Sequence, residues 1–333
     1  MLVFKDAFAA IEAPRGGVVT IGNYDGVHRG QRAILDQVRT RARALGAPAV
    51  VVTFEPHPLA VLRPGSAPPR LTTVAQKEEL LAAAGIDALL VVRFTEEFAA
   101  TPAEAFVEQF LAGQLGAREV HVGSGFCFGQ GREGSFAMLA ELGARHGFTA
   151  HAVPEVTHNG SRISSTRIRE AVAAGRVEEA AEMLGRPYGL AGLVVRGDQM
   201  GKRLGWPTAN VGKHDQLLPA DGVYAGRIHL PGVPATFTGV TNIGTRPTVY
   251  EHYQRVVETH ILDFSTDIYG QPVEVRLFRR LREERIFPSV MDLSAQIRRD
   301  VDATREYFAS RPRLLESAEA AEAPPPEGDT IHG

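Results

Sequence analysis

Short apolar segments alternate with amphipathic stretches throughout the first half of the chain. The apolar segments cover residues 17–21, 49–54, 88–93, 119–123 and 149–153. The amphipathic stretches between them cover residues 31–45, 74–84, 102–114 and 135–146. In the first of these, Ile34, Val38, Ala42 and Leu45 fall on one face of a helix. This alternation predicts a Rossmann-like domain, a parallel sheet covered by helices, whose ligands bind at the carboxyl ends of the strands.

The pattern changes at Gly185-Arg186-Pro187, where helix-forming residues give way to helix breakers. Two helical patterns precede this point, one starting near Ser165 and one over residues 177–184. Short alternating segments follow it, at residues 193–196, 223–229, 236–240, 257–264 and 273–278. Because turns rich in Gly, Pro and Asp separate these segments, they predict a compact antiparallel β-barrel, with a terminal helix over residues 291–308 packed against it.

These patterns divide the chain into three parts. We expect an α/β domain over residues 1–184, a β-barrel domain over 185–312 and a tail over 313–333. A chain of 333 residues is long enough for two separate hydrophobic cores. The tail is rich in Ala, Glu and Pro and has almost no bulky apolar side chains. Burial cannot offset the entropy cost of ordering such a segment, so we expect disorder there.

Composition excludes several classes of protein. Cys127 is the only cysteine, so it can form no internal disulfide, and no group of Cys and His has the spacing of a zinc domain. The net charge of −3 argues against a general nucleic-acid binder. No apolar run approaches the ~18 residues of a membrane span, and the first residues lack the layout of a signal peptide. We therefore expect a cytoplasmic protein without a membrane or nucleic-acid partner.

The residues that follow the first expected strand have the composition of a phosphate-binding turn. The stretch Gly22-Asn23-Tyr24-Asp25-Gly26-Val27-His28-Arg29-Gly30-Gln31 leads directly into a helix. Its glycines let the backbone turn off the sheet and approach a ligand closely, and the helix start offers unpaired N–H groups. His28 can donate a hydrogen bond to a phosphate oxygen there. A glycine-rich turn with an exposed histidine explains the stretch equally well.

Two further segments follow the second and fourth expected strands. In TFEPHP, two prolines bracket His57 and fix the direction of its side chain. In GSGFCFGQG, four glycines surround Phe126 and Phe128. A flat ring can lie against such a backbone, or the two phenylalanines can simply anchor the core.

A fourth polar segment opens the helix after the fifth expected strand. In ISSTRIR, Ser164 or Ser165 can cap the helix, and their hydroxyls and Arg169 can hold phosphates. Ordinary helix capping is the simpler explanation. All four segments lie on the same edge of the predicted sheet, however, which favours one shared ligand site.

The barrel half contains a basic, glycine-rich loop, GDQMGKRLGWPTAN, over residues 197–210. Such a loop can close over phosphates. The turn that ends it presents Thr208 and Asn210 two residues apart, on the same side if the chain is extended. Their oxygens suit Mg²⁺ or phosphate. The loop does not match the phosphate-binding pattern of P-loop kinases, and a basic turn with a buried Trp206 is the simpler alternative.

One charged residue, Glu258, lies inside the apolar strand pattern ETHILDF. A buried carboxylate is costly unless it is paired or functional. Beside a substrate hydroxyl, it can accept the hydroxyl proton as a general base. An exposed glutamate on a strand produces the same pattern.

The four segments of the first half resemble the FMN adenylyltransferase module of bacterial bifunctional riboflavin kinase/FAD synthetases. They are GNYDGVHRGQ, TFEPHP, GFCFGQGREG and ISSTRIRE. The family's first motif ends in His-x-Gly-His, a nucleotidyltransferase signature that binds ATP phosphates. Here His28 stands at the first position and Gln31 at the second. Glutamine can donate a hydrogen bond but carries no positive charge, so adenylyl transfer should be slower if this position stabilises phosphate charge in the transition state.

The resemblance implies roles for other residues of this half. It makes His28 the catalytic group, places Asn23 and His57 near the FMN/ATP pocket, and places three residues near the ATP phosphates. Those three are Ser164, Thr166 and Arg169. The remaining residues expected at the nucleotide or flavin are Gly22, Gly30, Gln31, Phe126 and Phe128.

The second half resembles the riboflavin kinase module of the same family over nearly all of residues 190–310. The matching segments are GDQMGKRLGWPTAN, GVYAGRI, NIGTRPTV, ETHILDF and YGQPVEVRLFRRLREERIF. The resemblance implies that Thr208 and Asn210 hold Mg²⁺ with the nucleotide and that Glu258 activates the terminal ribityl hydroxyl of riboflavin. The loop residues expected to cover the nucleotide are Gly197, Gly201, Lys202 and Gly205.

The leading hypothesis is therefore an enzyme with two activities. ATP phosphorylates riboflavin to FMN in the barrel half, and a second ATP adenylylates FMN to FAD in the α/β half, both with Mg²⁺. One alternative is a monofunctional riboflavin kinase whose first half binds nucleotide in a regulatory role, and only Gln31 favours it. A non-catalytic flavin-binding protein, or one that acts on nucleic acid, fits the intact set Thr208, Asn210 and Glu258 and the mildly acidic charge less well.

Overall fold

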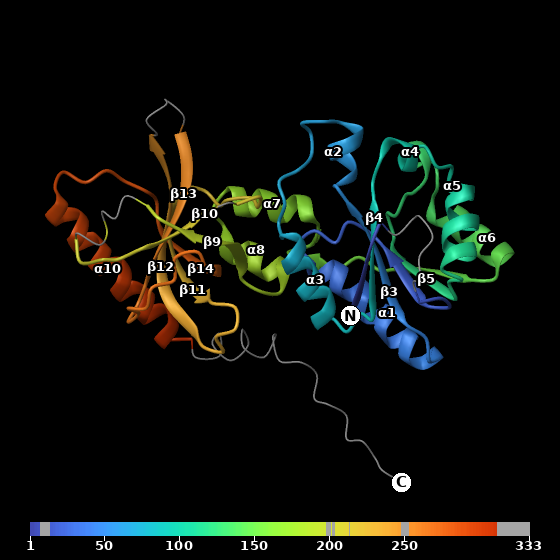
Figure 1. Cartoon of the computed structure of the whole chain (residues 1–333), viewed down its shortest axis with the longest axis horizontal. Coiled ribbons are helices and arrows are strands. Elements are labelled where there is room, and N and C mark those ends of the chain that lie inside the picture. Colours follow the sequence, from blue (N-terminus) through green and yellow to red (C-terminus); the bar gives the residue numbers. More distant parts are fainter. Residues whose placement is uncertain (7–13, 198–200, 202–203, 213, 248–252, 312–333) are drawn as a thin grey trace, which may run out of the picture. The chain divides into compact units, whose positions relative to one another are not determined.

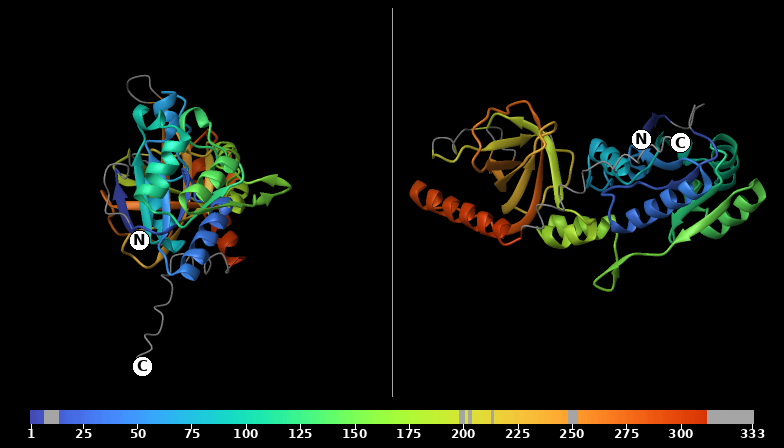
Figure 2. Two further views of the ribbon diagram at one scale, coloured as in Figure 1. Left: turned by 90° about the vertical axis from the view of Figure 1, so that its right-hand side faces the viewer. Right: turned by 90° about the horizontal axis from the view of Figure 1, so that it is seen from below.

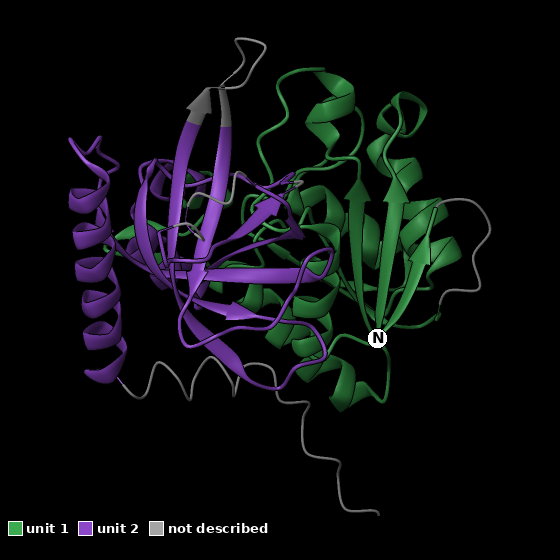
Figure 3. Cartoon of the chain, turned by 60° about the vertical axis from the view of Figure 1, so that its left-hand side comes forward, with its two compact units in different colours: residues 1–168 green, residues 169–333 purple. Residues whose placement is uncertain are grey.

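Two units of different architecture make up the chain (Figures 1 and 3). The computed structural model describes residues 1–6, 14–197, 201, 204–212, 214–247 and 253–311. Contacts divide the chain into unit 1, residues 1–168, and unit 2, residues 169–333. The boundary that we expect between the two functional domains, after residue 184, lies later in the chain than this division by contacts. That boundary stays a prediction. The expected disordered tail at 313–333 lies outside the described residues.

Unit 1 is built on a six-stranded sheet with strand order β1-β4-β3-β2-β5-β6. The strands are β1 (Leu2–Lys5), β2 (Val18–Ile21), β3 (Ala49–Glu55), β4 (Ala88–Arg93), β5 (Glu119–Gly123) and β6 (Thr149–Val153). All neighbouring pairs are parallel, which confirms the predicted sheet. The edge strand β1 was not expected, because its short, mostly exposed run carries no alternating pattern. Strand order reverses between β2 and β5, so their carboxyl ends form the switch point where such sheets bind ligands.

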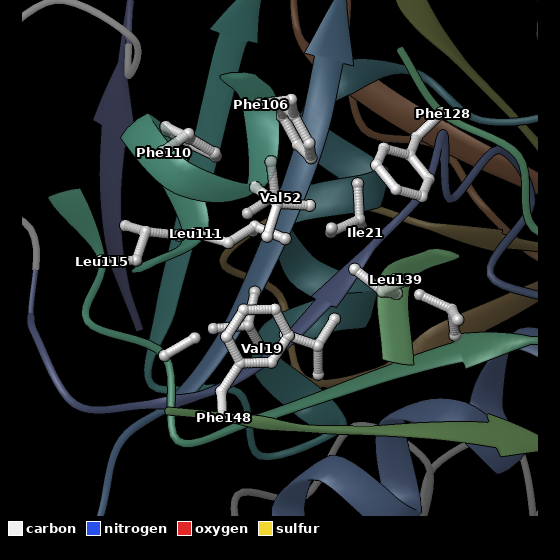
Figure 4. Packing of buried hydrophobic residues seen from close by; sticks show 14 of the residues in the cluster. Val19, Ile21, Val52, Phe106, Phe110, Leu111, Leu115, Phe128, Leu139 and Phe148 are labelled. Carbon is white, nitrogen blue, oxygen red and sulfur yellow. The ribbon is translucent and has the colours of Figure 1, made fainter. Parts of the chain in front are cut away.

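Helices cover both faces of this sheet, and strand residues alternate between the two cores. Val18 and Val51 pack against the helices α1 (Arg29–Leu45) and α3 (Val74–Ala83). On the other face, Val19 and Val52 pack against the π-helix η1 (Phe106–Gln114) and against α6 (Phe136–His146) (Figure 4). The sequence predicted all four of these helical stretches.

Several short elements of unit 1 were not predicted. They are α2 (Pro58–Leu62), α4 (Glu96–Ala99), the 3₁₀ turn η2 (Gln130–Arg132) and the paired strands β7 (Thr157–His158) and β8 (Ser161–Arg162). Elements this short leave too little periodicity in the sequence to be distinguished from loops.

Three further helices lie where the sequence predicted helical patterns. Helix α5 (Ala103–Ala105) lies within the predicted stretch 102–114. Helix α7 (Ser165–Ala173) spans the division between the units, and α8 (Val177–Leu184) follows it.

Unit 2 contains a closed antiparallel barrel with strand order β10-β13-β12-β11-β14-β9, as the sequence predicted. Its strands are β9 (Tyr188–Val195), β10 (Ala209–Gly212), β11 (Gly222–His229), β12 (Thr236–Pro247), β13 (Tyr253–Ile261) and β14 (Pro272–Arg282). Strand β9 pairs with β10 and closes the barrel. The unexpected strand β10 begins directly after Thr208 and contains Asn210.

The terminal helix α10 (Val290–Ala309) runs along one side of the barrel (Figure 2), which confirms the predicted helix. Phe308 of α10 packs edge-on against Phe278 of β14, with ring centroids 5.1 Å apart. Both rings are buried together with Ala225 of β11. Among the described helices, none combines the length and the apolar character needed to cross a lipid bilayer.

Candidate functional site

A buried carboxylate holds the loop between β2 and α1 in unit 1. Asp25 accepts hydrogen bonds from the backbone N–H groups of Leu71 (3.0 Å) and Thr72 (3.1 Å) and from the Thr72 hydroxyl (3.2 Å). The same hydroxyl accepts a hydrogen bond from the N–H of Gly26 (3.1 Å). The Ser165 hydroxyl at the start of α7 donates to the Asp25 carbonyl oxygen (2.9 Å). The loop is therefore fixed by two segments that are distant in sequence.

His28 and Gln31 cap the start of α1 reciprocally. The His28 Nδ1 atom accepts a hydrogen bond from the N–H of Gln31 (3.3 Å), and Gln31 Oε1 accepts one from the N–H of His28 (3.1 Å). Because Nδ1 is an acceptor, the neutral ring carries its proton on Nε2. A Cβ atom on Gly30 would lie only 3.2 Å from this ring, so the glycine allows the close approach. Gln31 thus has a structural role in addition to the predicted contact with phosphate.

The structure brings Asn23 and His57 together, as expected for residues of one pocket. The Asn23 amide and His57 Nε2 are 3.2 Å apart. His57 Nδ1 accepts a hydrogen bond from the N–H of Leu59 (3.1 Å) at the start of α2, which fixes the ring. The Thr53 hydroxyl donates to the Asn23 carbonyl oxygen (3.2 Å) and holds its backbone. Both side chains lie beyond the carboxyl ends of β2 and β3.

Phe126 and Phe128 stack on each other, with centroids 5.6 Å apart and an interplanar angle of 15°. Phe128 is buried in the core that includes Phe106, whereas Phe126 is half-buried at its edge. The sequence left open whether the two phenylalanines contact a ligand or anchor the core, and the structure shows that Phe128 anchors the core.

Ser164, Thr166 and Arg169, which we expect near the ATP phosphates, lie at the start of α7 or just before it. The Ser164 hydroxyl accepts a hydrogen bond from the N–H of Arg167 (3.3 Å), so it caps the helix. Thr166 is exposed, and Arg169 belongs to unit 2 by its contacts. Gly22, directly after β2, lies against the ring of Tyr24, 3.3 Å from where a Cβ atom would stand.

A cavity of about 600 Å³ lies between the barrel and α10 in unit 2. Its wall contains Glu258 of β13, Asn242 of β12 and Thr208, together with apolar side chains of the barrel and of α10. In the antiparallel register, Glu258 stands opposite Asn210 on β10 and opposite Asn242 on β12. Residues paired in this way project from the same face. The register therefore arranges one carboxylate and two amides in a row.

A second cavity, of about 500 Å³, shares Thr208 with the first. Its other lining residues include the neighbours of Thr208 and residues of the loop after β13, among them Phe264 and Tyr269. The glycine-rich loop adjoins this region, because a Cβ atom on Gly197 would lie 2.5 Å from Asn210 Cγ. Gly201 lines the larger cavity. Gly205 has a φ of 80°, which a glycine adopts without strain, and Lys202 lies outside the described residues.

An ion pair that the sequence did not reveal lies in the wall of the larger cavity. Arg282 of β14 contacts Asp300 of α10 at 2.8 Å, and Gln296 donates to the same carboxylate at 2.8 Å. Asp300 is almost fully buried, with 5% of its surface exposed. Nothing in the sequence indicates that a charged residue of a strand and a charged residue of a helix lie in contact.

His260 supports the turn that carries Thr208. Its Nδ1–H donates to the Pro207 carbonyl oxygen (2.7 Å), and its ring meets the Trp206 ring edge-on at 5.4 Å. The Trp206 indole N–H donates in turn to the Ser294 hydroxyl of α10 (3.1 Å). Trp206 is therefore half-buried between the barrel and the terminal helix, rather than buried as the alternative interpretation of the loop expected.

A known family model matches each of the two halves of the chain. The FAD synthetase family model matches residues 10–167, and the riboflavin kinase family model matches residues 184–308. These matches and the two folds define the class of protein, which joins an FAD synthetase domain to a riboflavin kinase domain. Because a family model of each activity matches, the monofunctional alternative is not favoured.

Known relatives match almost the whole chain. A protein of Escherichia coli (strain K12) is 42% identical over 89% of this chain and 95% of its own length, and one of Pseudomonas fluorescens is 40% identical over 89% and 94%. Both are named bifunctional riboflavin kinase/FMN adenylyltransferase. The chain belongs to this bifunctional riboflavin kinase/FMN adenylyltransferase family, and the resemblance drawn from its motifs is confirmed.

A solved structure with the same architecture is described as a macrolide-efflux protein from Streptococcus pneumoniae. It aligns with a TM-score of 0.83 at 29% identity, over 92% of this chain and 99% of the other. The likeness in fold thus extends along both units.

Replacing Asp25 should loosen the β2–α1 loop. In Asp25→Ala, the buried N–H groups of Leu71 and Thr72 lose their acceptor, and we expect unit 1 to lose about 2 kcal/mol of unfolding free energy or more. Hydrogen exchange read by mass spectrometry should become faster at residues 22–31 and 70–73. Asp36→Ala is the control, because Asp36 is exposed and its ion pair with Arg39 contributes at most about 1 kcal/mol. Equal exchange in the two variants would contradict the anchoring role.

Proposed function

We propose that the chain phosphorylates riboflavin to FMN with ATP in its riboflavin kinase domain, residues 185–312. It then adenylylates FMN to FAD with a second ATP in its FAD synthetase domain, residues 1–184. The observation that carries the first reaction is that Thr208 lines both of the cavities described above, while Glu258 lines the larger one. A flavin in the larger cavity and a nucleotide in the smaller one would therefore meet beside Thr208.

The kinase reaction needs a hydroxyl and a phosphate held in line. The larger cavity is lined by apolar side chains that suit the flavin rings. It is also lined by the paired polar side chains of Glu258 and Asn242, which suit the ribityl chain. Glu258 accepts the proton of the terminal ribityl hydroxyl as its oxygen bonds to the γ-phosphorus of ATP and the bond to ADP breaks. Gly197, Gly201, Lys202 and Gly205 cover the nucleotide.

Thr208 and Asn210 provide the oxygen ligands that Mg²⁺ prefers. The strand register supports this role, because it pairs Asn210 with Glu258, while Thr208, two residues before Asn210, lines both of these cavities. When bound, Mg²⁺ neutralises charge on the transferred phosphate. His260 positions Thr208 through the Pro207 carbonyl.

The adenylyl transfer needs no side-chain nucleophile, because the FMN phosphate is already an anion. Its oxygen attacks the α-phosphorus of ATP, and pyrophosphate leaves. His28, through Nε2–H, and the N-terminus of α1 stabilise the charge that develops on the phosphates. The glycines at 22 and 30 allow the close approach of ligand and backbone.

The remaining residues of this domain surround the two substrates. Asn23, His57 and Phe126 contact the flavin or nucleotide, with Phe128 supporting Phe126 from the core. Ser164, Thr166 and Arg169 hold the ATP phosphates. Both reactions take place in the cytoplasm, where the lone Cys127 stays reduced.

Glu258→Gln should separate the two activities. The amide cannot accept the hydroxyl proton, so we expect FMN formation to fall by about 10²–10⁴-fold. FAD formation from supplied FMN should stay unchanged, because it takes place in the other domain. Chromatographic separation of riboflavin, FMN and FAD over time measures both rates. Glu283→Gln, at an exposed position of the same unit, is the matched control. Loss of both activities in Glu258→Gln would argue against separate sites.

Substitutions of Gln31 should distinguish its charge from its capping role. Gln31→Glu keeps a favoured capping acceptor but adds negative charge, so we expect FAD formation to slow by about tenfold without a loss of stability. Gln31→His should accelerate FAD formation if a positive charge at this position stabilises the phosphates. FMN formation serves as the internal control for both variants. Unchanged FAD formation in both would mean that position 31 only caps the helix.

A further inference from the structure

Three side chains that can bind metal, one glutamate and two histidines, meet on the sheet of unit 1, away from the switch point. Glu119 and His121 lie two residues apart on β5, and His151 stands opposite His121 on β6. One ligand atom from each lies within 4.8 Å of the others. Glu119 is the first residue of β5, whereas ligands of such sheets bind beyond the last. Neither proposed reaction uses these residues.

The distances between these atoms suit one bound metal ion. Glu119 Oε2 lies 2.9 Å from His121 Nε2 and 3.8 Å from His151 Nε2. Metal–ligand bonds of about 2.0–2.2 Å in a tetrahedral zinc site place neighbouring ligand atoms about 3.3 Å apart. The two observed separations lie on either side of this value.

Arg41 orients the Glu119 carboxylate. Its Nη2 atom bonds to Oε1 at 2.5 Å, and its Nε atom lies 3.2 Å from Oε1 and 3.0 Å from Oε2. The oxygen facing both histidines is Oε2, and fixed carboxylates of this kind are typical beside metal sites. The positive charge of Arg41 limits the affinity for a cation.

Burial and access also fit a metal site. His121 is almost fully buried, and its Nε2 atom hydrogen-bonds to the Glu119 carboxylate at 2.9 Å, a contact that a bound ion would replace. The His151 side chain is 44% exposed on the edge strand β6 and gives an ion a route from solvent. The Thr149 hydroxyl, 3.3 Å from His151 Nε2, lies on the same open side.

We propose that Glu119, His121 and His151 bind one divalent metal ion of the zinc type, with the remaining coordination position open to solvent. Two imidazoles and one carboxylate favour Zn²⁺ or Co²⁺ over Mg²⁺, which prefers oxygen ligands alone. The bound ion joins edge strand β6 to β5. The site is separate from the Mg²⁺ that supports phosphoryl transfer.

Co²⁺ provides a direct test on the full-length protein. The protein is treated with a chelator, dialysed and titrated with Co²⁺ in excess Mg²⁺. We expect visible d–d absorption bands of low-coordinate Co²⁺ that saturate at one ion per chain and disappear when Zn²⁺ is added. Absence of such bands, or their loss to Mg²⁺, would overturn the proposal.

His151→Phe identifies the ligands. It keeps an aromatic ring beside His121, whose centroid lies 4.6 Å from that of His151, but removes the ligand nitrogen. We expect Co²⁺ affinity to fall by at least about 100-fold, the upper end of the loss seen for outer partners of metal ligands. His146→Ala removes an exposed histidine of α6 and should bind Co²⁺ normally. Unchanged affinity in His151→Phe would overturn the proposal, and His151→Gln repeats the test if the phenylalanine variant does not fold.

Discussion

Strand register determines which side chains meet in both units. Side chains alternate along a strand, and residues paired across neighbouring strands project from the same face. In the barrel, the pairing of β10, β13 and β12 places Asn210, Glu258 and Asn242 in one row. In the parallel sheet, the pairing of β5 and β6 places His121 beside His151. A shift of one residue in either pairing would turn these groups to the opposite face and remove the site.

The N-terminus of α1 illustrates how one helix start combines a structural and a chemical role. The first N–H groups of a helix have no partners within it, so they bind either a capping side chain or an anion. His28 and Gln31 cap this end reciprocally, and the cap fixes the His28 proton on Nε2. The departure of Gln31 from the family's motif therefore removes a charge but keeps a good helix cap.

Periodicity in the sequence predicted the central strands, the long helices and the closed barrel, because these elements bury one regular face. It did not predict β1, which is short and exposed at the sheet edge, or β10, which lies within a glycine-rich loop. Motifs pointed to His28, Thr208 and Glu258, and the last two line one cavity of the barrel unit. Contacts between distant segments, such as Asp25 with Leu71 and Arg282 with Asp300, leave no local pattern. The same holds for Glu119, His121 and His151, because zinc-spacing rules describe ligands on one continuous segment.

Each unit has its own hydrophobic core, and this separation has a consequence for cofactor supply. Partial opening of one domain need not affect the other, since local unfolding follows the contacts within a cooperative region. Damage to the core of unit 1 would therefore leave FMN production running while FAD became scarce, whereas damage to the barrel would halt both at their source. A destabilising mutation would thus change the ratio of the two flavin coenzymes according to the unit in which it falls.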